Sequence, residues 1–128
     1  MASFVLKAAP PPEGSDRLGF DEKTMWHGKD ISAGDEVFLF AAEHHAGRGL
    51  YARGVVSKAV RGVGTRVSVT VTRTEAASRP LGRAELRPFR NRPDAGPAAE
   101  IDHKLYRQAT NKIAGISDAA ASFLRGFF

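Results

Sequence analysis

The sequence predicts a small α+β domain, in which five or six strands form a closed or nearly closed β-barrel and helices flank it at the C-terminal end. Two observations lead to this fold class. Short apolar or alternating segments, separated by turn residues, fill most of residues 1–90, and helical spacing replaces them over residues 98–128. The chain has 128 residues, a length typical of one domain. We therefore expect a single domain, residues 1–128, with a barrel core at 1–90 and C-terminal helices at 98–128 packed on it.

Five segments have the composition of strands. The clearest is 65–74, where Val67, Val69 and Val71 alternate with polar residues and therefore face the interior together. Gly54 interrupts another segment, and a glycine inside a strand predicts a bulge or a close approach of two backbones. The predicted strands are residues 3–8, 36–42, 50–58, 65–74 and 81–89, the last limited by a proline.

The connections are predicted from their polar residues, glycines and prolines. Residues 13–23 are polar and contain a glycine, so we expect a loop there, and Trp26 follows in the same irregular region. Residues 43–49 are a second predicted loop, between the two central strands. Two glycines at 62 and 64 turn the chain before the alternating strand.

Helical spacing dominates the C-terminal third. Ile101, Leu105, Ala109 and Ile113 lie four residues apart, which predicts a helix over 98–114 that Gly115 ends. The second predicted helix spans 118–125, with a serine at the N-cap position just before it. The residues expected to seal it onto the body are Phe123, Leu124, Phe127 and Phe128.

The composition excludes several classes of protein. There is no cysteine, which excludes disulfides, thiolate metal sites and thiol nucleophiles. Every apolar run is far shorter than the roughly 20 residues that span a bilayer. Residues 1–7 lack the basic leader and the apolar length of a signal peptide. We expect a soluble cytoplasmic protein with no membrane partner.

The positive charge is concentrated in the middle of the sequence. Residues 44–92 contain ten arginines and Lys58 against Glu75 and Glu85, a net charge of +9, whereas the rest of the chain carries −4. Such asymmetry indicates a polyanionic partner, first of all nucleic acid. Arginine binds phosphates and base edges with a planar guanidinium. The alternative is that these arginines are solvated groups on strand exteriors, in an Ala- and Arg-rich composition that hints at a bacterial source.

Trp26 is the single tryptophan and lies among polar residues. An indole beside a basic surface can stack on a base, which contributes about 1–3 kcal/mol, and the alternative is an indole that plugs the core from a loop. His27, next to it, has the chemistry to hydrogen-bond a base edge or is a solvated surface residue. Phe40 and Tyr51, on the predicted central strands, are further candidates to stack beside Trp26.

The loop at 43–49 carries two adjacent histidines and an arginine. Adjacent histidines point to opposite sides of an extended chain, and no further ligand follows at a metal-binding spacing, so a metal site is disfavoured. His44, His45 and Arg48 suit phosphate or base contacts better, together with Arg53 on the following strand. No phosphate-loop, dinucleotide or hydrolase-elbow motif occurs in the sequence.

The order of these segments resembles the EVE domain, a branch of the PUA-like superfamily, over nearly the whole chain. The first strand ends in Lys7 before a proline, where the family usually has Lys-Ser-Glu-Pro, and Trp26 follows a polar insert. A Gly-Asp pair at 34–35 then precedes an apolar strand, and 49–56 resembles the family's pattern Gly-Ile-x-Gly-x-Gly-x-Val. The segment 106–113 is also similar to the C-terminal part of EVE-like proteins. Ala8 and Ala9 replace the family's Ser-Glu, and the arginine and asparagine that accompany the family's tryptophan are missing.

The resemblance implies a small β-barrel with a concave pocket that binds DNA or RNA and accepts a flipped, modified base between aromatic side chains. It implies no enzyme activity and no cofactor, in a monomer or weak homo-oligomer. The nucleic-acid-binding residues expected on these grounds are Lys7, Trp26, His27, Phe40, His44, His45, Arg48, Tyr51 and Arg53.

Two other functions stay open at this point. One is a small ribonuclease similar to the ASCH relatives, in which Lys7, Tyr51 and a loop histidine would supply general acid–base catalysis. The other is a protein-interaction module that docks a partner through an exposed Phe127 and Phe128.

Overall fold

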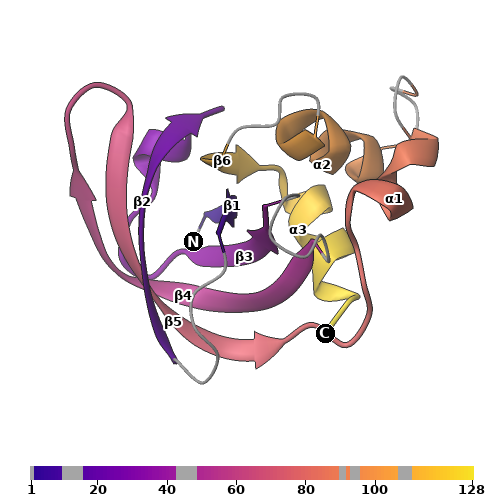
Figure 1. Cartoon of the computed structure of the whole chain (residues 1–128), viewed down its shortest axis with the longest axis horizontal. Helices are drawn as coiled ribbons and strands as arrows, with labels where there is room; N and C mark the ends of the chain where they lie inside the picture. Colours follow the sequence, from indigo (N-terminus) through magenta and orange to yellow (C-terminus); the bar gives the residue numbers. More distant parts are fainter. Residues whose placement is uncertain (1, 10–15, 43–48, 90–91, 93–95, 107–110) are drawn as a thin grey trace.

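A computed structural model describes residues 2–9, 16–42, 49–89, 92, 96–106 and 111–128. Its six strands form a closed barrel in the order β1-β3-β4-β5-β2-β6 (Figure 1). The strands are β1 (Ser3–Ala8), β2 (Arg17–Met25), β3 (Glu36–Ala41), β4 (Leu50–Arg61), β5 (Arg66–Ala76) and β6 (Lys112–Ile116). The helices are η1 (Gly28–Asp30), α1 (Arg83–Leu86), η2 (Arg87–Phe89), α2 (Pro97–Tyr106) and α3 (Asp118–Arg125).

The barrel closes through its shortest strand. β6 runs antiparallel to β1, with Lys7 opposite Lys112, and parallel to the end of β2, with Met25 opposite Ala114. β1 also pairs in parallel with β3, while β3, β4, β5 and β2 form an antiparallel succession. A strand near the C-terminus therefore joins the two strands that come first in the sequence.

Two apolar clusters lie on the two sides of the barrel wall. The barrel core fills the interior with residues such as Phe4, Leu39 and Val69. The helix-facing core lies between the outer side of β1, β3 and β6 and the helices, and includes Phe38, Leu105 and Leu124. Figure 1 shows α1, α2 and α3 on one side of the barrel, whereas β2 and the long β4–β5 hairpin form the other side. No helix in the described part of the chain is long and apolar enough to cross a membrane.

Several sequence predictions are confirmed. β1 and β3 lie where the apolar runs placed them, and Val67, Val69 and Val71 all face the barrel core. Gly54 lies at a shift in the β4–β5 register, and a methyl group on it would come within 2.5 Å of the carbonyl oxygen of Thr72. Ser117 caps α3, because its side-chain oxygen accepts a hydrogen bond from the N–H of Ala120.

The loop predicted over 13–23 is wrong from Arg17 onward, because these residues form β2. Only Leu18 and Phe20 supply apolar side chains to the interior, and exposed Gly19 and Asp21 alternate with them. Two apolar residues are too few to mark a strand in the sequence. The strand forms because its backbone N–H and C=O groups find hydrogen-bond partners in β5 along seven paired residues.

The strand predicted over 81–89 is also wrong. Leu81 makes a single bridge to Gly49, and the chain then turns into α1 and η2. The carboxylate of Glu85 accepts the backbone N–H of Gly82 at 2.6 Å, which stabilises the start of α1. Leu81 and Leu86 belong to the helix-facing core, so the apolar residues of this segment serve packing rather than sheet pairing.

The helix predicted over 98–114 is shorter, and a strand follows it. α2 ends at Tyr106, and residues 112–116 form β6, so Gly115 lies inside a strand rather than at a helix end. Ile101 and Leu105 pack in the helix-facing core, whereas Ile113 packs in the barrel core. The apolar residues spaced four apart therefore belong to two elements, α2 and β6, which pack in different clusters.

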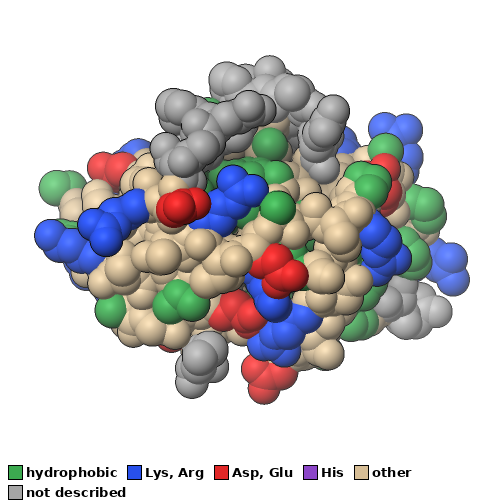
Figure 2. All heavy atoms as spheres, turned by 90° about the horizontal axis from the view of Figure 1, so that it is seen from below, with side chains coloured by type: hydrophobic (Ala, Val, Ile, Leu, Met, Phe, Trp, Pro, Cys, Tyr) green, Lys and Arg blue, Asp and Glu red, His purple; other side chains and the backbone are tan. Residues whose placement is uncertain are grey.

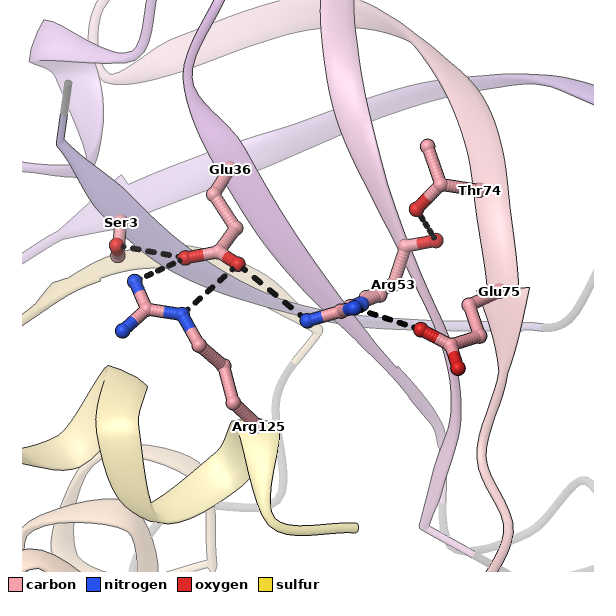
Figure 3. Close-up of polar contacts among 6 residues, drawn as sticks. All are labelled: Ser3, Glu36, Arg53, Thr74, Glu75 and Arg125. Carbon is pink, nitrogen blue, oxygen red and sulfur yellow. Dashed lines mark hydrogen bonds and ion pairs between the residues drawn. The ribbon is translucent and has the colours of Figure 1, made fainter. Parts of the chain in front are cut away.

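Polar contacts fasten the end of α3 to the sheet (Figure 3). Arg125 donates from Nη2 and Nε to the two carboxylate oxygens of Glu36, at 2.7 and 3.2 Å. Ser3 donates to the same carboxylate at 3.1 Å, and Arg53 lies 3.9 Å from it. Phe127 and Phe128 pack half-buried against the helix-facing core. The C-terminal phenylalanines therefore join the body of this domain, which removes the basis for a docking site made of exposed phenylalanines.

Candidate functional site around Trp26

Trp26 lies in a tight turn between β2 and η1. Trp26 and His27 have φ angles of 47° and 65°, and they are the two described non-glycine residues in the left-handed region. That conformation costs roughly 1–2 kcal/mol for a residue with a side chain, so surrounding contacts must hold it. Strained residues of this kind concentrate at functional sites.

Two glycines hold the turn against β6. Gly115 donates its N–H to the carbonyl oxygen of Trp26 at 3.0 Å. A methyl group on Gly28 would lie 2.2 Å from the carbonyl oxygen of Ile113, so only glycine fits at that position. The backbone of Trp26 is therefore fixed by close contact with a strand that lies far away in the sequence.

The indole of Trp26 is half-buried beside His103 of α2 and Lys112 of β6. Its ring meets the His103 ring edge-on with 5.6 Å between centroids, and the Lys112 Nζ lies 5.9 Å from the indole centroid. Lys7, opposite Lys112, donates from Nζ to the carbonyl oxygen of Leu105 at 2.7 Å. The Lys7 ammonium also lies 5.1 Å from the centroid of the Tyr106 ring. Both lysine side chains are fully buried, and cation–π contacts of this kind are strongest where water is excluded.

A cavity of about 360 Å³ opens beside this turn. That volume is in the range of small-molecule sites. Its wall is mainly apolar, with Phe4, Trp26 and Ile116, and polar side chains lie at intervals around it. The lining residues are Ala2, Ser3, Phe4, Trp26, His27, Asp30, Lys104, Gly115, Ile116 and Ser117.

The polar wall of the cavity is held by one carboxylate. Glu100 accepts hydrogen bonds from the backbone N–H of Ser117 at 2.8 Å, from its hydroxyl at 2.5 Å and from Lys104 at 3.0 Å. Burial acts to raise the pKa of Glu100, but the bonds from Ser117 and Lys104 outweigh it and lower that pKa below its usual value. Lys104 also donates to the carbonyl oxygen of Gly115 at 2.7 Å. The Glu100 carboxylate is therefore ionised at neutral pH and holds Ser117 and Lys104 in place.

The structure brings two of the predicted site residues together, since Trp26 and His27 line the same cavity. The His27 side chain is exposed and lies 3.9 Å from the carboxylate of Asp30. Lys7 is close to this region but lies under α2, outside the cavity lining. His44, His45 and Arg48 lie outside the described residues.

The other predicted residues lie elsewhere in the fold. Phe40 has an exposed fraction of 0% in the helix-facing core, so its ring has no free face for a base. Tyr51 packs against the barrel core, and burial, slightly offset by the charge of Arg73, raises its pKa to about 12. Arg53 forms a 2.6 Å ion pair with Glu75 beside its contact with Glu36. We therefore retain Trp26 and His27 as the centre of the candidate site.

The sequence did not identify the residues that α2 and β6 supply. Lys104 lines the cavity, and His103 and Lys112 contact the indole ring. Lys112 falls within the helix predicted over 98–114, but it lies on β6 and is fully buried. No signal in the sequence shows that the C-terminal segment pairs with β1, because that pairing spans more than 100 residues.

The residues needed for an acid–base ribonuclease do not come together in the described part of the chain. Lys7 lies against Leu105 and Tyr106 of the helix-facing core, whereas Tyr51 packs with the barrel core. Within the same described ranges, no three His, Cys, Asp or Glu side chains gather in a way that could hold a metal ion.

The charge of residues 44–92 is partly neutralised. Besides the Arg53–Glu75 pair, Arg66 forms an ion pair with Asp21 at 3.0 Å, whereas Arg79 donates to the uncharged carbonyl oxygen of Gly126 at 2.7 Å. Figure 2 shows one face of the molecule, on which Lys and Arg side chains are spread out and several lie beside acidic ones. The positive charge on that face is therefore distributed rather than gathered in one patch.

Comparison with solved structures identifies the fold. A crystal structure of human THYN1 in complex with 5-methylcytosine-containing DNA is 12% identical, covers 98% of this chain and 96% of its own, and superposes with a TM-score of 0.70. The DUF55 domain of human thymocyte nuclear protein 1 gives 12% identity, coverage of 98% and 97%, and a TM-score of 0.69. The fold is that of an EVE/PUA-like barrel.

Rpa0253 from Rhodopseudomonas palustris has the same architecture, with 14% identity, coverage of 99% and 92%, and a TM-score of 0.65. No family model matches the sequence, and no curated protein sequence matches it. The EVE/PUA-like barrel expected from the resemblance is thus confirmed at the level of the fold. At these identities the likeness extends to the backbone and not to individual site residues.

Proposed function

We propose that this protein is a non-enzymatic nucleic-acid-binding module that takes a modified base into the Trp26 cavity. The observation that carries the proposal is the position of Trp26. The single indole of the chain lies on the wall of a cavity, in a left-handed turn that two glycines fix against β6. The fold around it is the one in which THYN1 was crystallised with 5-methylcytosine-containing DNA.

The cavity has the chemistry for a base. Its apolar wall, with Phe4 and Ile116 beside Trp26, offers contact to the flat faces of a heterocycle. His27, Asp30 and Ser117 offer donors and acceptors to its edges. Extruding a base costs a few kcal/mol, and stacking on an indole returns about 1–3 kcal/mol.

Discrimination of a modified base would come from two contributions. Burying one added methyl group against Phe4 or Ile116 contributes about 1 kcal/mol, which is less than a tenfold preference. A fixed polar group must therefore add to it. Lys104 and Ser117 are held rigidly by Glu100 and suit that role.

The test is a titration of the intrinsic fluorescence of Trp26 with short oligonucleotides. The panel contains single- and double-stranded DNA and RNA, each unmodified and with a methylated or hydroxymethylated base, at two salt concentrations. We expect quenching that favours one modified strand and weakens with salt. Binding without any preference for a modified base would contradict the base-reading part of the proposal.

Variants at position 26 locate the bound base. Trp26→Phe keeps an aromatic face, and Trp26→Ala removes it, so we expect affinity for labelled oligonucleotides to fall about tenfold or more only in Trp26→Ala. Because Trp26 also contacts the helix-facing core, both variants are first compared by thermal unfolding. Equal affinity of folded Trp26→Ala and wild type for every oligonucleotide would overturn the proposal. Incubation with labelled RNA tests ribonuclease activity in the same preparations.

A further inference from the structure

The outer side of the barrel away from the helices has an unusual distribution of charge. β4, β5 and β2 lie side by side there, and residues paired across them face outward together. Each row of paired residues crosses β4, β5 and β2 in that order. One row consists of Lys58, Thr70 and Gly19, and the next consists of Val60, Ser68 and Asp21. We call this surface the outer β4–β5–β2 face. The helices α2 and α3 pack on β6 and β1, across the barrel from it (Figure 1).

Basic side chains outnumber acidic ones on this face. Arg17, Lys23, Lys58 and Arg66 project from it, and Asp21 is the exposed carboxylate among them. Farther along β5, Glu75 is already paired with Arg53. Asp21 pairs with Arg66, and both side chains are more than half exposed. An ion pair so exposed contributes little and exchanges readily for another anion. In the described part of the chain the other three cations form no ion pair.

A groove runs across the centre of this face. It has a volume of about 390 Å³ and is lined by Lys58 and Val60 of β4, Ser68 and Thr70 of β5, and Gly19 and Asp21 of β2, the Asp21 carboxylate being the one already paired with Arg66. The groove is open at Gly19, because a methyl group placed on it would have nothing within 4 Å. Hydroxyl groups beside a lysine can donate hydrogen bonds to phosphate oxygens.

Two of the three exposed large apolar side chains in the described residues lie on the same face. Val55 and Val60 are 39% and 49% exposed, and the third, Val63, lies at the hairpin tip between β4 and β5 with 91% exposed. Apolar side chains that lie between cations and hydroxyls can contact the sugars of a bound nucleic-acid strand, and this contact removes them from water.

The face leads directly to the Trp26 site. Lys23, on β2, lies opposite Arg66 and three residues before Trp26 in the sequence. Lys29 of η1 donates to the carbonyl oxygen of Gly64 at 3.0 Å, and Thr24 donates from Oγ1 to that of Thr65 at 2.7 Å. These bonds join the hairpin tip to the turn that carries Trp26. From Arg17 to Lys23 the strand spans about 20 Å.

We propose that the outer β4–β5–β2 face is a second nucleic-acid contact, which binds the sugar–phosphate backbone beside the strand whose base enters the Trp26 cavity. This inference rests on the proposed function and adds a surface to it. Charge complementarity selects the occupant, because three cations that form no ion pair with a described residue face outward together with three hydroxyl side chains, Ser68, Thr70 and Thr72.

The test uses two pairs of variants matched in charge. Arg17→Glu with Lys58→Glu reverses two cations on the face, and Arg87→Glu with Arg92→Glu makes the same change at exposed positions near the helices. We expect the first pair to bind an oligonucleotide about tenfold or more weakly than the second. The slope of log affinity against log salt should become shallower by about 1.5, as for the loss of two phosphate contacts.

A third variant blocks the groove without touching a cation. Gly19→Glu fits the open space at Gly19 and places a carboxylate in the groove. Its control is Ser122→Glu, at an exposed position on α3. We expect only Gly19→Glu to weaken binding, with thermal unfolding of both variants close to that of the wild type.

The outcomes separate the two proposals. If wild type binds no oligonucleotide, both proposals fail. If Trp26→Ala abolishes binding but the face variants behave as their controls do, this inference alone is overturned. If the face variants lose affinity and Trp26→Ala does not, the outer β4–β5–β2 face is the binding surface and the Trp26 cavity is not.

Discussion

Gly115 and Trp26 are joined by a backbone hydrogen bond so close that it leaves no room for a side chain at position 115. The N–H of Gly115 donates to the carbonyl oxygen of Trp26 at 3.0 Å, and a methyl group on Gly115 would lie 2.6 Å from that same oxygen. Because Gly115 lies on β6, the strand that closes the barrel also sets the position of the indole.

We predict that Gly115→Ala displaces the turn at Trp26. The methyl group meets backbone rather than a movable side chain, so the turn must shift or the strand must part from it. We expect a changed Trp26 emission spectrum and a loss of roughly 1–3 kcal/mol in unfolding free energy. Gly126→Ala, whose nearest contact is 3.3 Å, serves as the control. An emission spectrum identical to that of the wild type would contradict the close packing.

We predict a modest effect of Arg125→Ala and a larger one of Glu36→Ala. The Arg125 side chain is 47% exposed, so its pair with Glu36 should contribute about 0.5–1 kcal/mol to stability. Glu36 is 14% exposed and accepts from both Arg125 and Ser3 (Figure 3). Its removal should cost about 1–2 kcal/mol. Denaturant unfolding of the two single variants and the double variant measures the coupling, and strict additivity would show that the pair contributes nothing.

We predict that the Glu100 carboxylate stabilises the folded protein at neutral pH and that this stabilisation is lost in acid. Its pKa is lowered in the folded protein, so its contribution is present above the unfolded value near 4.5 and is lost as the pH falls through the lower folded value. Glu100→Gln should therefore be less stable than wild type at neutral pH, and the difference should shrink in acid. Thermal unfolding from pH 7 down to acid checks this, and a difference that does not depend on pH would contradict it.

We predict the opposite type of dependence for Tyr51, at alkaline pH. Burial raises its pKa to about 12 from an ordinary value of 10.0, so its contribution is complete below pH 10 and is lost as the pH rises toward 12. Unfolding free energies of wild type should fall more steeply over that range than those of Tyr51→Phe. Absorbance titration of phenolate, with Tyr51→Phe as reference, should place the ionisation of this side chain near pH 12. Ionisation near pH 10 would show that Tyr51 is more open to water than the structure has it.

The sequence predicted those elements whose signal lies within a few neighbouring residues. The apolar run before Ala42, the alternating valines from Val67 and the serine before α3 each have a local physical cause, and each lies where it was expected. The order of segments led to the correct barrel fold. The role of Trp26 at a nucleic-acid site stays a prediction.

Tertiary structure alone decided the elements that depend on distant partners. β2 has too few apolar residues to be predicted as a strand, and it forms because it pairs with β5. β6 has apolar residues at helical spacing, and it becomes a strand because it pairs with β1. The same closure brings Gly115 and Lys104 to Trp26, and it buries Phe40, which the sequence had offered as a residue to stack on a base. Local patterns in a sequence report backbone preference and amphipathic faces. Which faces meet depends on contacts between residues far apart along the chain, and those contacts exist only in the closed barrel.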